Sequence, residues 1–161
     1  MTISPGVSAS EMLAALERAG LRSTRPRNAL IEQIAEWATV GKDFTSEELW
    51  HATQNRAPWI GRATAFRTVE LLTALGFLDQ VTFADGGERY HLVQPGTHHH
   101  HLTCAECHRV VSIDACLPEQ ILAKVERQSG FAISGHRVEL FGRCPSCQAR
   151  HMEAIAPDAT T

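Results

Sequence analysis

The sequence lacks the features that would place a protein in a membrane or outside the cell. No apolar run approaches the length of about 20 residues that a transmembrane helix requires. The N-terminus has no basic segment followed by an apolar core, so we expect no secretory signal peptide. No internal repeats are visible. We therefore expect a cytoplasmic protein of one domain or two small ones, with no membrane partner.

The chain also has no excess of positive charge. It carries 15 Lys and Arg against 18 Asp and Glu, a formal net charge of -3. Bulk electrostatics therefore give no argument for nucleic-acid binding, and any such binding has to come from a local basic patch. Arg22, Arg25 and Arg27 form one such patch within six residues.

Cysteines are few but their spacing is informative. Of the 5 cysteines, four form two Cys-x-x-Cys pairs, Cys104 with Cys107 and Cys144 with Cys147. In a reducing compartment such pairs indicate metal ligands rather than disulfides, because each pair can clamp one edge of a tetrahedral zinc ion. The wide separation of the pairs predicts that the ion ties together two parts of a small domain. Cys116 is left over, and we interpret it as a buried or bystander thiol.

A run of four histidines at residues 98–101 leads directly into the first cysteine pair. If this segment is a strand, its side chains alternate between the two faces. His98 and His100 then point one way and His99 and His101 the other, so that the strand offers imidazoles to two separate places. A flexible, tag-like run is the alternative, but such tags lie at termini and this run is internal. Clustered histidine and cysteine favour metal binding here.

Helix-forming patterns occupy the first half of the chain. Apolar residues recur at helical spacing, and serine, threonine, proline and glycine stand where helices begin and end. The predicted helices run from a cap at Ser8 or Ser10 to Gly20, from the first turn at Pro26 through Trp37, from the capping sequence at 45–48 onward, and from about Arg62 to Leu75.

Strand-like segments at 77–83 and 88–93 follow, joined by an Asp-Gly-Gly turn at 85–87. Helices followed by such a ribbon are typical of a winged-helix domain, which we place at residues 1–93. Residues 94–97 (QPGT) are the natural hinge to a second domain at 98–150. That domain is predicted to hold a strand with the cysteine knuckle, further elements at 109–113, 118–128, 131–133 and 136–141, and then a loose, disordered tail at 151–161.

The helix from Arg62 to Leu75 is a candidate for reading DNA. Its apolar stripe, Ala65, Val69, Leu72 and Leu75, faces inward and leaves small and charged residues on the opposite face. Small residues let a helix lie deep in a groove, arginines reach phosphates or guanine edges, and Phe66 can pack against thymine methyl groups. A plain amphipathic helix with solvated arginines is the alternative. The residues that we assign to DNA contact are Arg22, Arg25, Arg27, Arg62, Ala63, Thr64, Phe66 and Arg67.

Four motifs, in order, carry a resemblance that spans residues 10–150. They are GLRSTRPR at 20–27, ATAFRT at 63–68, HHHHLTCAEC at 98–107, and HRVELFG at 136–142 with the second cysteine pair. With them the chain resembles the ferric uptake regulator family of bacterial metal-responsive repressors. The resemblance implies an α+β fold, with an N-terminal winged helix-turn-helix domain and a small C-terminal α/β dimerisation domain with a four-cysteine zinc site. It also implies a homodimer, not an enzyme, that binds an A/T-rich palindromic operator in double-stranded DNA and represses metal-uptake genes.

The resemblance further implies three metal sites. The structural zinc is assigned to Cys104, Cys107, Cys144 and Cys147. The regulatory site at the hinge is assigned to His91, His99, His101 and Asp43. A second site is assigned to His98, His100, Glu119 and His136.

This sequence departs from the family pattern at several of these positions. Phe66 replaces the usual tyrosine of the recognition helix, Asp43 a histidine, and His91 a carboxylate. Ser112 stands where another carboxylate is expected, although Asp114 is close. The loss of carboxylates at His91 and Ser112 counts against a peroxide-sensing member, which is expected to use carboxylates to bind iron.

The expected regulatory donors, three nitrogens and one oxygen, indicate the sensed metal. Such a set suits tetrahedral zinc better than oxygen-rich ferrous coordination, so we favour zinc over iron. Three alternatives from other classes remain open. They are a zinc hydrolase with Glu106 as its base, a Cys-x-x-Cys redox protein, and a metal-buffering protein that binds no DNA.

Overall fold

The computed structural model describes residues 7–96, 98, 100–113 and 115–155, with the side chains of 152–155 left aside. The chain divides into two compact units. The N-terminal unit comprises Met1–Thr82 and Gly87–Thr97, and the C-terminal unit comprises Phe83–Gly86 and His98–Thr161. No helix in the described part of the chain is both long and apolar enough to span a bilayer.

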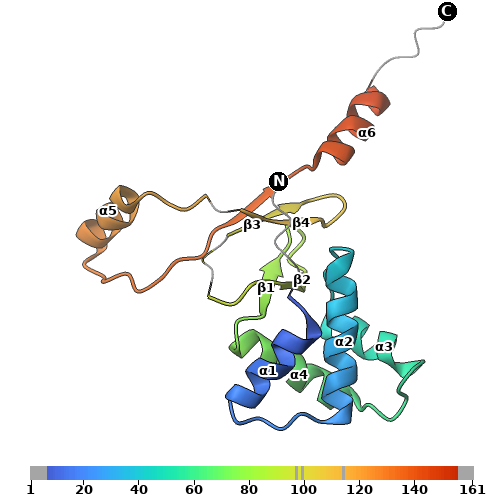
Figure 1. The fold of residues 1–161 in the computed structure, drawn as a ribbon. Coiled ribbons are helices and arrows are strands. Elements are labelled where there is room, and N and C mark those ends of the chain that lie inside the picture. The colour runs from blue at the N-terminus through green and yellow to red at the C-terminus, as the bar shows by residue number, and fades with distance from the viewer. Residues whose placement is uncertain (1–6, 97, 99, 114, 156–161) are drawn as a thin grey trace, which may run out of the picture. The chain divides into compact units, whose positions relative to one another are not determined.

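The N-terminal unit is a winged helix-turn-helix (Figure 1). Four helices precede an antiparallel hairpin in which Leu78 pairs with Leu92 and Thr82 with Glu88. An isolated bridge between Phe44 and Tyr90 connects the hairpin to the segment before the third helix. The elements are α1 (Ala9–Arg18), α2 (Arg25–Thr39), α3 (Ser46–Gln54), α4 (Arg62–Ala74), β1 (Leu78–Thr82) and β2 (Glu88–Leu92).

The predicted caps explain where these helices begin and end. Ser8 closes a capping box with Glu11 at the start of α1, and Thr45 closes one with Glu48 at the start of α3. Gly76 follows α4 with φ of +77°, a left-handed conformation that glycine adopts without strain. The helices and the hairpin enclose one core, in which the fully buried side chains include Met12, Leu16, Leu30, Ile31, Ile34, Phe44, Leu49 and Leu72.

The C-terminal unit holds a three-stranded sheet and two helices. The strand order is β4-β3-β5, in which β3 is antiparallel to β4 and parallel to β5. No residue of α5 is buried. The elements are β3 (His100–Cys104), β4 (Val110–Ile113), α5 (Glu119–Ser129), β5 (Glu139–Gly142) and α6 (Pro145–Ile155).

Three predictions for this unit differ from the structure, one because the predicted strand is absent and two in their bounds. Residues 131–133 form no strand, because the Ile133 amide donates to the Glu126 carboxylate at 2.8 Å instead of to a neighbouring strand. The strand expected at 136–141 begins only at Glu139. The tail expected at 151–161 is helical as far as Ile155, since α6 continues through residues that favour helix, while 156–161 lie outside the described residues.

Candidate metal centres and nucleic-acid interface

The four cysteines of the two pairs converge in the C-terminal unit. The sulfurs of Cys104, Cys107, Cys144 and Cys147 all lie within 4.8 Å of one another. The Cys107 and Cys144 sulfurs are 3.6 Å apart. Four thiolates around a zinc ion with bonds of about 2.3 Å stand about 3.8 Å from one another. The cluster therefore has the donors and nearly the spacing of a tetrahedral zinc site.

Strand pairing assembles this cluster from distant parts of the sequence. The parallel register of β3 and β5 sets Cys104 opposite Gly142, and the Ala105 amide donates to the Gly142 carbonyl at 2.8 Å. The chain then turns into α6, so that the second pair reaches the end of β3. His108 closes the first knuckle in a left-handed conformation, with φ of +57°. The site is thus part of the fold of this unit.

The thiols in the cluster differ in acidity. The Cys107 and Cys144 amides point at the Cys104 sulfur and lower the pKa of its thiol to about 6. Burial, helped by the neighbouring Cys144 thiol, raises the pKa of Cys147 to about 12. Backbone donors favour the first thiolate, while desolvation opposes the last one. A bound cation would supply the positive charge that four thiolates need.

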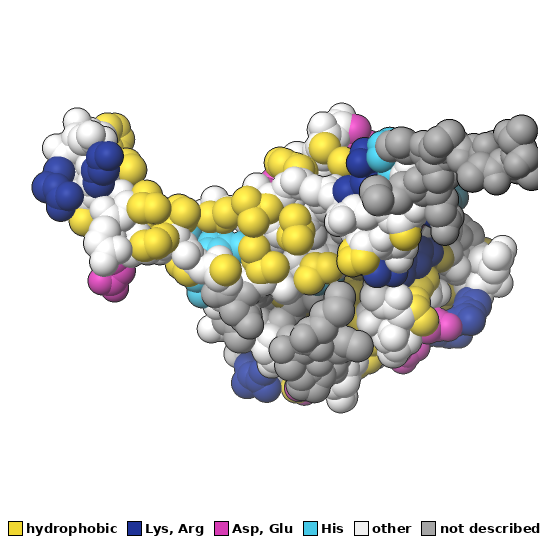
Figure 2. Space-filling view, turned by 90° about the horizontal axis from the view of Figure 1, so that it is seen from above, with side chains coloured by type: hydrophobic (Ala, Val, Ile, Leu, Met, Phe, Trp, Pro, Cys, Tyr) yellow, Lys and Arg dark blue, Asp and Glu magenta, His cyan; other side chains and the backbone are white. Residues whose placement is uncertain are grey.

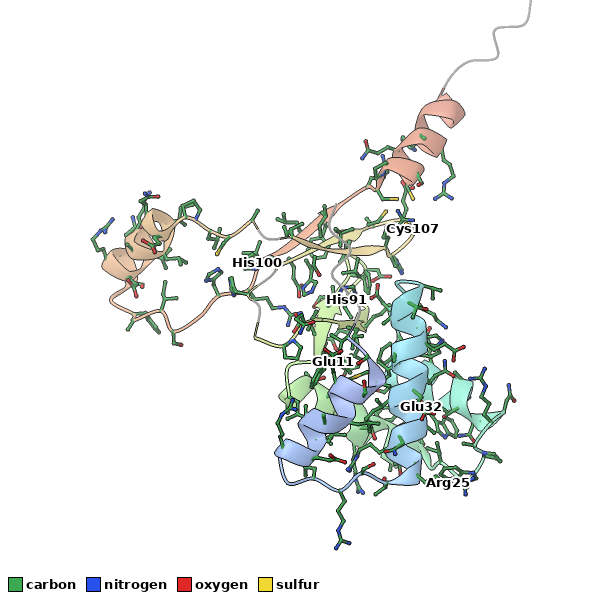
Figure 3. The ribbon with its side chains drawn as sticks, viewed as in Figure 1. Glu11, Arg25, Glu32, His91, His100 and Cys107 are labelled. Atoms are coloured by element: carbon green, nitrogen blue, oxygen red, sulfur yellow. The ribbon has the colours of Figure 1, made fainter. Side chains whose placement is uncertain are left out.

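A second cluster lies in the same unit. The potential ligand atoms of His98, His100, Cys116 and His136 also lie within 4.8 Å of one another. His98 and His100 contribute to the same cluster, as the alternation of side chains along a strand predicts. Figure 3 labels one residue of each cluster, His100 and Cys107. The fourth member is Cys116 and not Glu119, which stands exposed at the start of α5.

Cys116 is therefore the residue that reasoning from the sequence missed. It is exposed, so the interpretation of Cys116 as a buried thiol is wrong. No spacing motif marks it, because it stands alone between β4 and α5. The one available signal was that it is the fifth cysteine in a chain whose other four are paired by spacing.

The residues expected at the regulatory site are divided between the two units. In the N-terminal unit, Asp43 Oδ1 and His91 Nδ1 are 2.6 Å apart, and both side chains are largely buried. In the C-terminal unit, His101 is only 2% exposed and pairs in register with Ser112. His99 and Asp114 lie outside the described residues. The structure thus joins one predicted pair across 48 residues of sequence, and the complete site stays a prediction.

Helix α4 presents the two faces expected of it. Ala65, Val69 and Leu72 are buried, whereas Ala63 and Arg67 are exposed and Thr64 is half-buried. Leu75 lies just beyond the helix and is half-buried. Within the described part of the chain, the Arg67 side chain makes no hydrogen bond or ion pair, so its guanidinium is available to a ligand.

The other predicted DNA-contact residues carry local interactions. Arg62 lies over the Phe66 ring at 4.4 Å and pairs with Glu47 at 2.7 Å. Arg25 lies over the Trp59 ring at 4.8 Å. Arg22 is exposed, and Arg27 donates to its carbonyl oxygen. All of these residues belong to the N-terminal unit.

The C-terminal unit also exposes large apolar side chains, and hydrophobic surface gathers over it in Figure 2. Helix α5 has no buried residue, although an amphipathic helix normally packs its apolar stripe against another element. The exposed apolar surface is therefore a candidate for contact with another protein. The exposed apolar residues are Leu102, Ile121, Val125, Phe131, Leu140 and Phe141.

Comparison with known proteins gives consistent matches. The model of the Ferric uptake regulator family matches residues 18–141. The ferric uptake regulation protein of Bacillus subtilis is 34% identical over 140 residues, covering 86% of this chain and 93% of that protein. The Vibrio cholerae ferric uptake regulator structure is 26% identical, with a TM-score of 0.58 over 81% of this chain and 98% of that one. A zinc uptake regulator solved with zinc and DNA shares the fold at 21% identity, with a TM-score of 0.68 over 91% of this chain and 99% of that one.

Proposed function

Because the chain belongs to the ferric uptake regulator family of metal-responsive transcriptional regulators, we propose that it is a zinc-sensing repressor of metal-uptake genes. The observation that carries the choice of zinc is the contact between Asp43 and His91. An ionised Asp43 accepts from His91 Nδ1, which makes Nε2 the metal-binding atom of that imidazole. With His99 and His101, the donors are rich in nitrogen, as zinc prefers.

The proposed DNA-binding face is the exposed side of α4, which would enter the major groove with Arg67 as a base or phosphate contact. The arginines at the start of α2 would hold the phosphate backbone. A homodimer would present two such helices to the halves of an A/T-rich palindrome. The exposed apolar surface of the C-terminal unit supports this pairing, because two copies could cover it. The cytoplasm, where such an operator is found, is the proposed location.

Metal control would act through the hinge at residues 94–97. Asp43 and His91 belong to the N-terminal unit, and His101 to the C-terminal unit. One ion bound by His91, whose imidazole Asp43 orients, and by His101 would fix the relation of the two domains, and it would act only through its higher affinity for the DNA-binding arrangement. The four-cysteine cluster would hold zinc in both states as part of the fold. Membership in a family of transcriptional regulators sets the hydrolase alternative aside.

Iron is the second candidate for the sensed metal, because the Bacillus subtilis relative at 34% identity is named for ferric uptake. A DNA-binding titration distinguishes the two. The protein would keep its cysteine-bound zinc, be stripped at its histidine sites, and be titrated with an A/T-rich palindrome from upstream of its own gene at buffered free zinc, ferrous iron, nickel or manganese. We expect sub-nanomolar free zinc to restore binding. Restoration by ferrous iron alone would overturn the zinc assignment, and no response to any metal would overturn the hinge mechanism.

A further inference from the structure

We propose that Cys116 is a metal ligand, and that with His98, His100 and His136 it forms a three-nitrogen, one-sulfur site for a divalent ion that accepts thiolate, zinc before iron or manganese. The cluster is built from three separate segments of the C-terminal unit, namely the histidine run, the chain before α5, and the chain before β5. Imidazole and thiolate are both zinc donors, so the residues present fit the ion.

The interatomic distances match those of a tetrahedral site. With zinc–nitrogen bonds of about 2.05 Å and a zinc–sulfur bond of about 2.3 Å, two nitrogens stand about 3.3 Å apart and a nitrogen and the sulfur about 3.6 Å apart. In the structure, His98 Nε2 and His136 Nε2 are 3.1 Å apart. Cys116 Sγ lies 3.6 Å from His98 Nε2 and 3.0 Å from His136 Nε2. These three atoms therefore already form nearly one face of the tetrahedron.

His100 supplies the fourth position from inside the unit. Its ring is 1% exposed, and its centroid lies 4.6 Å from that of His98 and 5.2 Å from that of His136. The Val138 amide donates to His100 Nδ1 at 3.2 Å. A nitrogen that accepts this hydrogen bond leaves the other ring nitrogen protonated. Coordination by either nitrogen therefore requires the Val138 hydrogen bond to break, which couples metal loading to the start of β5.

The environment of Cys116 differs from that of an ordinary unpaired cysteine. Free cysteines that serve only packing are usually buried as small apolar side chains. Cys116 is instead exposed, and its sulfur lies within contact distance of two imidazole nitrogens, those of His98 and His136. Glu119, which the family resemblance assigns to this position, is absent from the cluster among the residues described. A carboxylate oxygen is thus replaced by a softer donor, which lowers the preference for iron and manganese.

The test compares Cys116→Ser with the matched variant Glu119→Gln in the full-length protein. Each protein keeps its four-cysteine zinc, is stripped at the histidine sites, and is titrated with cobalt(II) and then zinc against a competing chelator. We expect wild type and Glu119→Gln to show a thiolate-to-cobalt charge-transfer band that Cys116→Ser lacks. We also expect Cys116→Ser to bind the ion at least about tenfold more weakly. Loss of a residue that only hydrogen-bonds to a metal ligand already lowers metal affinity by about that factor, and loss of the ligand itself should cost at least as much. Weaker binding in Glu119→Gln but not in Cys116→Ser would overturn the assignment.

Thiol alkylation of the wild-type protein gives a readout that needs no variant. Peptide mass analysis would follow the labelling of Cys116 with and without one equivalent of zinc beyond the cysteine-bound ion. We expect the added zinc to slow labelling at Cys116 more than tenfold. Equal labelling rates in a sample that has bound the second zinc would sink the proposal. The role of this site in sensing rests on the proposed function, but neither experiment contains DNA, so failure here and failure of the repressor proposal are separate results.

Discussion

Arg62 and Arg67 both lie on α4 but differ in what they contact. Arg62 is engaged by Phe66 and Glu47, so its movement to DNA would cost the interactions that it makes in the free protein. The Arg67 side chain has no such partner within the described residues, so it would bind DNA without first breaking contacts in the free protein. At the residue scale, Arg67 is therefore the position whose loss should affect DNA binding most directly.

We expect Arg67→Ala to weaken operator binding about fivefold to 150-fold, which corresponds to the usual cost of about 1–3 kcal/mol for a lost base contact. Metal content should not change, because Arg67 belongs to neither metal cluster. Fluorescence anisotropy with a labelled operator at fixed salt measures the affinity. Arg18→Ala is the matched control, since Arg18 is an exposed arginine of the same unit outside the proposed face. Equal losses in both variants would indicate a general charge effect.

At the element scale, α2 and α3 begin with the same residue type in different ways. Thr45 accepts from the Glu48 amide at the start of α3, and Glu48 accepts from the Thr45 amide. Thr24 occupies the corresponding position of α2 but makes no side-chain capping bond. Pro26 starts that helix instead, because its fixed φ suits the first turn. Substitution of each threonine by alanine therefore separates the effect of a lost capping bond on stability from the effect of removing a threonine side chain.

We expect Thr45→Ala to lower the free energy of unfolding of the N-terminal unit by about 1 kcal/mol, the typical cost of a lost cap. Thr24→Ala should change it by less than about 0.5 kcal/mol, because no capping bond is lost. Urea denaturation followed by circular dichroism, with zinc kept bound, measures both. A result in which both variants lose the same stability would contradict the capping account.

At the scale of the whole molecule, the two units are stabilised differently. The N-terminal unit has a continuous apolar core. Among the residues described, the buried apolar side chains of the C-terminal unit are only Phe83, Cys104 and Cys147. A unit with so little apolar burial needs another source of stability, and a structural metal is one such source. We therefore expect the metal and the partner copy to stabilise the C-terminal unit, as the apolar core stabilises the N-terminal unit.

We expect Cys147→Ser, or chelation of the cysteine-bound zinc, to unfold the C-terminal unit and leave the N-terminal unit folded. Hydrogen exchange should show loss of protection for the amides that pair β3 with β5, and retained protection in α2 and α4. Glu119→Gln is the control, because Glu119 is an exposed residue of the same unit that belongs to neither cluster. Persistent protection in β3 after complete zinc removal would contradict a structural role for the ion.

We expect Val125→Glu to convert the proposed dimer into monomers and to weaken operator binding. Val125 is 46% exposed on α5, and a buried carboxylate without a partner would oppose pairing of two apolar surfaces. Analytical ultracentrifugation measures the mass. The matched control is Val40→Glu, because Val40 is 75% exposed in the other unit. An unchanged dimer in Val125→Glu would place the interface elsewhere.

The sequence by itself determined the order of the elements in the N-terminal unit, and it identified the four cysteines that form one cluster. Caps at Ser8 and Thr45, the glycine after α4, and the apolar stripe of α4 are local patterns, so they act before any distant contact forms. The paired spacing of the cysteines is local too, although the fact that the two pairs meet depends on the β3–β5 register. Helices and ligand pairs could be predicted because their residues lie within a few positions of one another.

Only the tertiary structure decided which residues complete each site. Cys116 and Glu119 are three positions apart, and no local pattern tells which one approaches the histidines. The contact between Asp43 and His91 likewise depends on how β2 packs beside the segment before α3. The missing strand at 131–133 shows the same limit, because a strand exists only where a partner strand accepts its hydrogen bonds. Local sequence selects backbone conformations, whereas contacts between distant residues are set by the packing of whole elements.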